Sequence, residues 1–351
     1  MSIDEVRERS PEAAAPRRPA DRSAVRLTII VWSVVAVFVL VTAARSAQVG
    51  IPLRDPAGAI FRVRLAKAVV ALVLLALGDA VVRTALGGWS WRGVARRLRS
   101  RWTRERIALV VSGLLAYHVV YVCYRNLKSW DAFLSDRDHG MLSLDRAVFL
   151  GHSPAVLLHD LLGQNTAAVV LAVVYRSFTN LVPLSVVGTL ALLPRVREAY
   201  VLLCSAMWVW ILGVASYYLV PTLGPFASAP AEFAGLTRTA ITTSQETYLA
   251  ERAHLLAAPG AGDAFASISA FASLHVGFTC MVVLVAHYYR WRRTTIVMTV
   301  YLAAVMVSTV YFGWHFVADD VAGVLLALAA VALGRLMVNP RGSRDDRTVP
   351  S

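Results

Sequence analysis

The chain has 351 residues, of which 57% are hydrophobic and 16% are charged, and its formal net charge at pH 7 is +13. This composition is too apolar for a soluble globular domain and is typical of a protein that crosses a membrane several times. The basic residues are spread over short segments between apolar runs, so they indicate membrane topology and contact with anionic lipid, and nucleic-acid binding is not predicted.

The N-terminal part of the chain combines a polar tail with two apolar runs. Residues 1–25 are rich in Arg, Glu, Pro and Ala, and we expect a disordered cytoplasmic tail there and no cleaved signal peptide. Apolar runs near residues 27–44 and 68–86 follow, and the segment 89–106 is basic. We therefore predict that residues 26–106 contain two N-terminal transmembrane helices and a basic loop.

Further apolar runs along the chain each have the length needed to cross ~30 Å of hydrocarbon. They lie near residues 107–123, 166–193, 199–220, 274–289, 294–312 and 316–338. We predict an all-α polytopic membrane protein of about eight transmembrane helices, with a six-helix catalytic membrane domain at 107–338 and a cytoplasmic tail at 339–351. A count of about seven or nine is the alternative, because some runs contain polar residues such as Asp79 and Arg176.

The placement of arginine predicts the orientation of these helices. If they alternate, both tails, the 89–106 loop and the short turns share one side, which is richer in Arg and Lys and should be cytoplasmic. The longer segments 125–165 and 222–273 then lie on the exoplasmic side, which we expect to be that of the cell membrane. Residues 126–162 alternate charged and apolar positions and predict one or two amphipathic helices in the exoplasmic interface.

Two histidines and an aspartate are predicted to meet on the exoplasmic side. His275 begins one apolar run, and His315 begins another, with Asp319 four residues later. One imidazole can attack phosphorus while the carboxylate fixes its tautomer and stabilises its cation, and the other imidazole can protonate the departing oxygen. The pattern therefore indicates nucleophilic phosphoryl transfer. Asp320 is predicted to face away from His315, because it lies five residues further along a helix.

These residues resemble the second and third signatures of the type-2 phosphatidic acid phosphatase superfamily, and within it the inositol phosphorylceramide synthase (inositolphosphotransferase) branch. The similarity rests on Ser273–Val276, on Ser308, His315 and Asp319 at steps of seven and four, and on Leu144-Asp145 and Pro221–Pro225. It covers residues 107–338 and implies the six-helix core of that superfamily. It also implies that His315 is the nucleophile that forms a phosphohistidine, that Asp319 orients it, and that His275 is the general acid and base.

The sequence departs from the family pattern at the cations that hold phosphate. A Lys followed by an Arg-Pro pair is absent, and Thr309 stands where the family has an Arg. A phosphoryl group in transfer still requires cations or preorganised donors around its equatorial oxygens. Arg125 and Arg176 are the candidate substitutes. The alternatives are that Arg125 reaches lipid phosphates and that Arg176 forms a packing ion pair with Asp79.

Small side chains in the apolar runs have two interpretations. Ser273 and Ser308 are candidate donors to phosphate, although small hydroxyl residues also allow close helix packing. Cys123, Cys204 and Cys280 are expected to be small buried hydrophobic residues without a disulfide. The remaining histidines have no ligand-like spacing, so we predict neither a metal site nor a cofactor.

The sequence favours a membrane lipid phosphotransferase that moves a phosphoryl or phospho-alcohol group from a lipid to a hydroxyl acceptor. A phosphatase of the same mechanism, acting on a lipid phosphate or an isoprenoid (di)phosphate, is the first alternative, because the choice between water and alcohol depends on the cavity. A non-catalytic transporter or scaffold is the second. The partners predicted are a membrane lipid and the bilayer, and the oligomeric state stays open.

Overall fold

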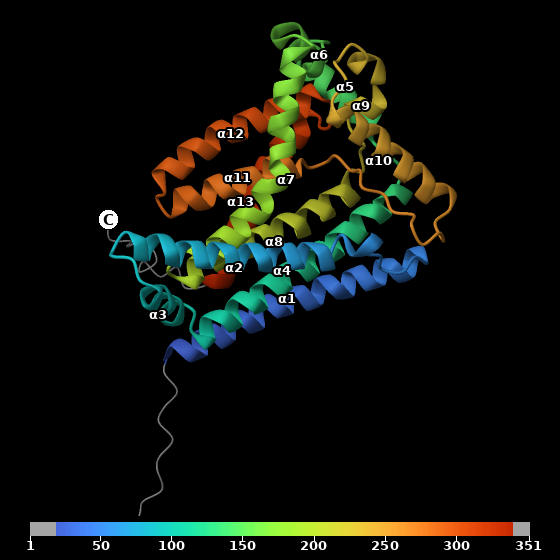
Figure 1. Ribbon diagram of the computed structural model, residues 1–351. Helices are drawn as coiled ribbons and strands as arrows, with labels where there is room; N and C mark the ends of the chain where they lie inside the picture. The colour runs from blue at the N-terminus through green and yellow to red at the C-terminus, as the bar shows by residue number, and fades with distance from the viewer. Residues whose placement is uncertain (1–18, 340–351) are drawn as a thin grey trace, which may run out of the picture.

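The chain folds into a bundle of helices (Figure 1). The computed structural model describes residues 19–339. The long helices are α1 (Pro19–Val49), α2 (Arg62–Ala85), α4 (Arg104–Trp130), α7 (Thr166–Leu192), α8 (Val196–Leu219), α11 (Leu274–Tyr288), α12 (Arg292–Tyr311) and α13 (Val317–Val338). The shorter ones are α3 (Trp91–Arg101), α5 (Asp138–Val148), α6 (Pro154–Leu162), α9 (Pro225–Ser228) and α10 (Ala240–Ala257).

The predicted all-α membrane architecture is confirmed. Every predicted apolar run lies in a helix, and 7 of these helices are long and apolar enough to cross a bilayer. The remaining run forms α11, which has only 15 residues. No strand occurs between residues 19 and 339. The helices could be predicted from the apolar runs because no water is available in the hydrocarbon core of a bilayer. The backbone of such a run must therefore form its hydrogen bonds within a helix.

Hydroxyl side chains define the start of several helices. Ser90 before α3, Thr103 before α4 and Ser273 before α11 each accept a hydrogen bond from a backbone N–H in the first turn. Such caps satisfy donors that have no partner inside the helix. The cap at Ser273 also fixes where α11 begins, one residue before His275.

Helix α8 forms the centre of the bundle. Of the candidate spans it has the largest buried share, and it packs against α13, α4, α11 and α7. Helix α13 also lies close to α11: a Cβ atom at Gly323 would be 2.5 Å from the carbonyl oxygen of Ser273. Only glycine permits this approach, which is the usual means of close packing between membrane helices. The two N-terminal helices pack on the outside, α1 against α4 and α2 against α7.

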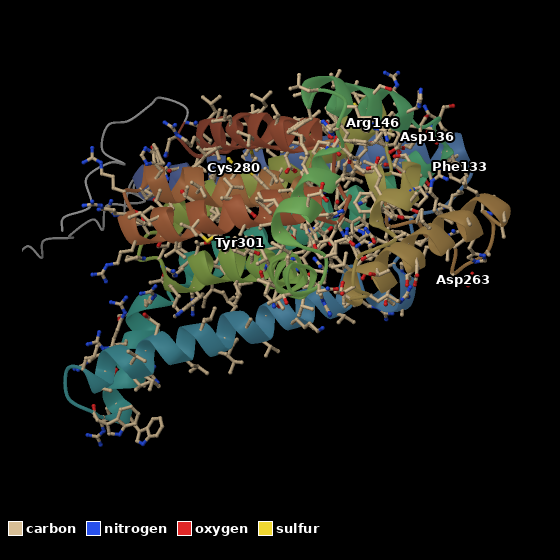
Figure 2. All side chains as sticks on the ribbon, turned by 90° about the horizontal axis from the view of Figure 1, so that it is seen from above. Phe133, Asp136, Arg146, Asp263, Cys280 and Tyr301 are labelled. Atoms are coloured by element: carbon tan, nitrogen blue, oxygen red, sulfur yellow. The ribbon has the colours of Figure 1, made fainter. Side chains whose placement is uncertain are left out.

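The short helices α5, α6, α9 and α10 gather at one end of the bundle, and α3 lies toward the other (Figure 1). Figure 2 shows Phe133, Asp136, Arg146 and Asp263 at the end that carries α5, α6, α9 and α10. Cys280 and Tyr301 lie along the long helices. Helices α5 and α6 fall in the segment predicted to contain interfacial amphipathic helices. The two ends therefore correspond to the two groups of loops that arginine placement separates.

The tails lie mostly outside the described residues. Residues 1–18 of the expected N-terminal tail and residues 340–351 of the C-terminal one are not described. Helix α1 begins at Pro19, earlier than the tail boundary expected at residue 25. The three cysteines are buried and free.

Candidate active site

A loop of residues 312–316 joins α12 to α13 and carries His315. The segment Pro221–Pro225 and the residue after it lie against this loop: the N–H of Phe226 donates to the carbonyl of Gly313 at 3.0 Å. Gly224 has a φ of +105°, and a Cβ atom there would lie 2.6 Å from the carbonyl oxygen of Trp314. A glycine is thus required both by the backbone conformation and by the contact.

Two aspartates from α5 fix this arrangement. The Asp138 carboxylate accepts hydrogen bonds from the N–H groups of Leu223 and Gly224, at 2.8 Å from each. The Asp145 carboxylate accepts one from the N–H of Val317, the first residue of α13, at 3.0 Å. Burial raises the pKa of both carboxyl groups, and the backbone donors oppose that rise. The Leu144-Asp145 and Pro221–Pro225 elements therefore act together in positioning the residues around His315.

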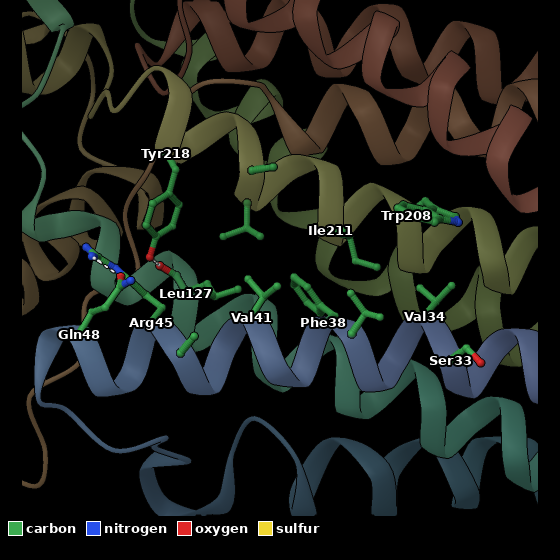
Figure 3. Close-up of a pocket in the computed structure, with 14 residues that line it drawn as sticks. Ser33, Val34, Phe38, Val41, Arg45, Gln48, Leu127, Trp208, Ile211 and Tyr218 are labelled. Carbon is green, nitrogen blue, oxygen red and sulfur yellow. Dashed lines mark hydrogen bonds between the residues drawn. The ribbon is translucent and has the colours of Figure 1, made fainter.

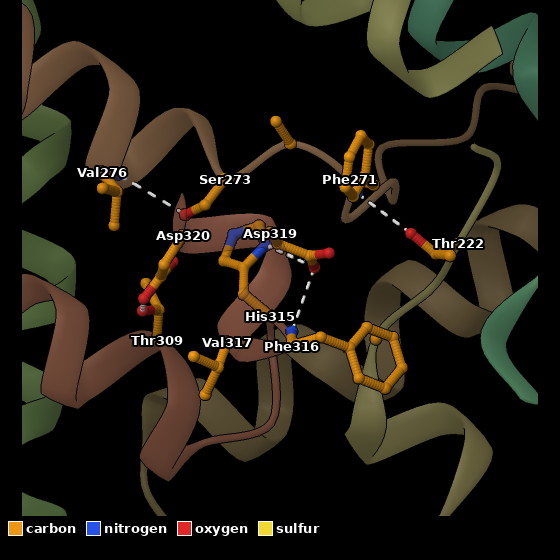
Figure 4. Close-up of polar contacts among 12 residues, drawn as sticks. Thr222, Phe271, Ser273, Val276, Thr309, His315, Phe316, Val317, Asp319 and Asp320 are labelled. Carbon is orange, nitrogen blue, oxygen red and sulfur yellow. Dashed lines mark hydrogen bonds and ion pairs between the residues drawn. The ribbon is translucent and has the colours of Figure 1, made fainter. Parts of the chain in front are cut away.

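The predicted pair of His315 and Asp319 is in contact (Figure 4). The Nδ1 atom of His315 lies 3.4 Å from Oδ2 of Asp319, and both side chains are buried. That oxygen also accepts a hydrogen bond from the N–H of Phe316 at 3.0 Å. The backbone bond fixes the carboxylate, and the carboxylate faces Nδ1, which leaves Nε2 as the nitrogen available for attack.

Asp320 does not face away as predicted. It is buried, accepts a hydrogen bond from the Thr309 hydroxyl at 3.0 Å, and interacts electrostatically with His315. The prediction was wrong because it placed His315 on a helix, whereas α13 begins only at Val317. His315 lies in the preceding loop, so helical spacing does not decide which aspartate is near it. Asp319 and Asp320 are both near His315.

Burial lowers the pKa of the His315 imidazole to about 4, although the neighbouring Asp320 carboxylate acts in the opposite direction. The ordinary value is about 6.5. At neutral pH the ring is therefore uncharged, and an uncharged imidazole has the lone pair that a nucleophile requires.

The structure brings the second predicted histidine to the same place. The ring centroids of His275 and His315 are 6.0 Å apart. His275 is held between aromatic rings, with its centroid 4.3 Å from that of Tyr175 and 4.2 Å from that of Phe178. Helices α7, α11 and the loop before α13 thus meet at the histidine pair, although they are far apart in the sequence.

Both histidines line a cavity of about 370 Å³. Its wall also contains Arg125, Lys128 and Arg176, and it includes no carboxylate from the described residues. Arg125 donates a hydrogen bond to Ser267 at 3.0 Å. Five tyrosines complete much of the wall: Tyr121, Tyr124, Tyr175, Tyr217 and Tyr248. A cavity with positive charge and hydroxyl donors suits a phosphate group beside the histidines.

The ion pair of Arg176 with Asp79 is not formed. The Asp79 carboxylate instead contacts Arg83 at 2.6 Å and Arg101 at 3.4 Å, and no ion pair of Arg176 occurs within residues 19–339. Lys128, which was not among the residues predicted from the sequence, supplies a further cation to the cavity wall. Its position three residues after Arg125 on one helix face was the signal that could have found it.

The two serines do not line the cavity. The Ser273 hydroxyl accepts a bond from the N–H of Val276 at 3.5 Å, and the Ser308 hydroxyl donates to the carbonyl of Leu171 at 2.9 Å. Both side chains are buried within the packing of the helices. Their geometry matches the structural interpretation, a helix cap and a bridge between α12 and α7.

A comparison with known families agrees with this arrangement. A family model described as the PAP2 superfamily matches residues 139–333. No curated protein and no solved structure matches the chain. The matched segment contains His275, His315 and Arg176, whereas α1, α2 and α4 lie before it. Arg125 and Lys128 of the cavity wall therefore come from a helix outside the match.

Proposed function

Because this chain belongs to the PAP2 superfamily, we propose that it transfers a phosphoryl or phospho-alcohol group from a membrane lipid to a hydroxyl acceptor, with His315 as the nucleophile. The family membership itself supports the broader class, a lipid enzyme of phosphatase or phosphotransferase type. The observation that carries the proposal is the cavity in which two histidines, 6.0 Å apart, share a wall with Arg125, Lys128 and Arg176.

The reaction proposed has two balanced steps. In the first, Nε2 of His315 attacks phosphorus, the bond from phosphorus to the lipid oxygen breaks, and His275 gives a proton to that oxygen. In the second, the acceptor hydroxyl gives its proton to His275 and attacks phosphorus, and the phosphorus–nitrogen bond breaks. Asp319 stabilises the positive charge that His315 acquires on attack, and the three cations stabilise the charge on the equatorial oxygens.

Hydrolysis by the same residues is the second candidate, and one observation favours it. The sequence lacks the phosphate-binding cations typical of the family's phosphatases, yet three cations line the cavity, so a phosphate site of the kind that hydrolysis requires is present. The similarity of Ser273–Val276, Leu144-Asp145 and Pro221–Pro225 to the inositol phosphorylceramide synthase branch supports transfer. A transporter or scaffold has no need of a buried histidine–carboxylate pair, so we do not favour that class.

Product analysis tests the proposal. The purified chain is incubated with labelled lipid phosphates and phospholipids, with and without inositol or a lipid hydroxyl acceptor. Transfer predicts a labelled product that requires the acceptor, and hydrolysis predicts release of phosphate without it. The His315→Ala variant should do neither, while His152→Ala, a change at an exposed histidine outside the cavity, should behave as the wild type. Full activity of His315→Ala would exclude the mechanism.

A further inference from the structure

A second cavity lies between α1 and α8, away from the histidines, and we call it the α1–α8 cavity. It has a volume of about 710 Å³. Its wall is mostly aliphatic and aromatic, with Phe38, Val41 and Ile211 among the residues that Figure 3 shows pointing into it. None of its lining residues lines the active-site cavity. On α8, Trp208 and Tyr218 face this cavity, whereas Trp210 and Tyr217 face the other.

One end of the α1–α8 cavity is polar. Figure 3 shows Arg45, Gln48 and Tyr218 together at that end. Arg45 donates to the side-chain oxygen of Gln48 at 3.4 Å and lies 5.3 Å from the ring centroid of Tyr218. The Tyr218 hydroxyl in turn donates to the carbonyl of Leu127 at 2.9 Å.

The charge of Arg45 is not neutralised by an ion pair within residues 19–339. Its Nε is buried and has no hydrogen-bond partner in that range. Asp131 is near enough to interact electrostatically with Arg45, but it accepts its hydrogen bond from Ser269. A cationic side chain with a buried free donor, at the end of an apolar cavity, is complementary to an anion that carries a hydrocarbon chain.

The length of the cavity indicates where that anion comes from. From Val34 to Arg45 the rise of α1 is about 16 Å, which is close to half of the ~30 Å hydrocarbon core. The cavity thus suits chains from one leaflet. The polar end lies at the same end of the bundle as the active site, because Arg54, shortly after α1, donates to the carbonyls of Pro259 and Ala264.

We propose that the α1–α8 cavity binds one anionic phospholipid, with an acyl chain along α1 and the phosphate at Arg45. The site is distinct from the substrate site and lies partly outside the segment that the family model matches, because α1 precedes residue 139. It gives α1 a role in addition to anchoring: α1 forms one wall of a lipid site on the catalytic core.

The test uses the full chain in nanodiscs that contain phosphatidylcholine and a small fraction of phosphatidylglycerol with a photoreactive acyl chain. Crosslinking should map to peptides of α1 and α8, and native mass spectrometry should show one retained phosphatidylglycerol. Arg45→Gln should reduce the preference for phosphatidylglycerol over phosphatidylcholine about tenfold, as expected for loss of one charge-assisted contact. Ala215→Trp, which fills the cavity, should abolish crosslinking there.

Matched controls separate this site from the surrounding bilayer. Leu40→Trp changes a residue of α1 that is 68% exposed and does not line the cavity, and Arg293→Gln removes a charge elsewhere. Both should crosslink as the wild type. Thermal unfolding of each variant shows whether it is folded. Equal retention of the two lipids by the wild type, or equal effects of Ala215→Trp and Leu40→Trp in folded proteins, would overturn the proposal.

Discussion

The contact of His315 with Asp319 predicts the effect of removing the negative charge of Asp319. Asp319→Asn should keep the hydrogen bond from the N–H of Phe316, because the amide oxygen can replace the carboxylate oxygen as acceptor. The fold should therefore persist, while turnover falls by a factor on the order of 10² to 10⁴ as the imidazole loses its orienting anion. Turnover and circular dichroism of the variant check this. Wild-type turnover would remove Asp319 from the mechanism.

The burial of His315 predicts a dependence of stability on pH. Its folded pKa of about 4 lies below the ordinary value, so the unfolded chain binds the proton more readily. The stability contributed by the uncharged ring is complete above about pH 6.5 and is lost as the pH falls toward 4. Melting temperatures measured from pH 7.5 to 4.5 should fall less steeply for His315→Gln than for the wild type. Identical slopes would contradict the inferred burial of His315.

The cations of the active-site cavity make a separate prediction. Lys128→Met and Arg176→Gln should each lower kcat/KM. The decrease should correspond to a loss of about a few kcal/mol of transition-state stabilisation, the amount expected when one preorganised donor is removed. Arg176→Lys should restore part of it, since an ammonium group cannot form the paired hydrogen bonds of guanidinium. Arg83→Gln is the control, because Arg83 contacts Asp79 and does not line the cavity. If a folded Lys128→Met enzyme had normal kinetics, Lys128 would not be a phosphate ligand.

At the scale of elements, α5 positions the start of α13. Asp145→Ala removes the acceptor for the N–H of Val317, and loss of such a cap costs about 0.5–2 kcal/mol of stability. Because His315 is two residues before that N–H, we expect turnover to fall as well. Denaturant unfolding and kinetics of Asp145→Ala measure both effects. Asp136→Ala, a change at an exposed aspartate of the same end, should alter neither.

The helices were predictable from the sequence and the contacts between them were not. Apolar runs fixed the spans because burial of backbone in lipid leaves helix as the only solution. The His275 and His315 pair followed from motif spacing. Asp138 and Asp145 act by accepting hydrogen bonds from backbone N–H groups far along the chain, and such contacts leave no local periodic pattern. Lys128 differs from them, because its spacing from Arg125 was a local signal. Asp320 was misplaced for a related reason, since the exact start of α13 decides its direction.

For the whole molecule, the clustering of short helices at one end predicts sidedness. Cysteine introduced at Ser228 in a Cys-free variant should react with an impermeant maleimide on intact cells, and cysteine at Ser100 should not. Both serines are exposed, so a difference in labelling reports the side of the membrane. Permeabilised cells, in which both should react, are the control. The reverse pattern would place the active site on the cytoplasmic side.

The contact between α11 and α13 also limits how a substrate can enter. The N–H of Ser273 donates to the carbonyl of Asp319 at 2.9 Å, so one backbone bond joins the segments that hold the two histidines. If α11 swung outward to admit a lipid, His275 would move away from His315. The cavity therefore could not open between α11 and α13 while both histidines are in place for catalysis. Helix α10 forms another part of the wall, where Ser244 and Tyr248 line the cavity, so we expect a lipid to enter beside α10 and not between α11 and α13.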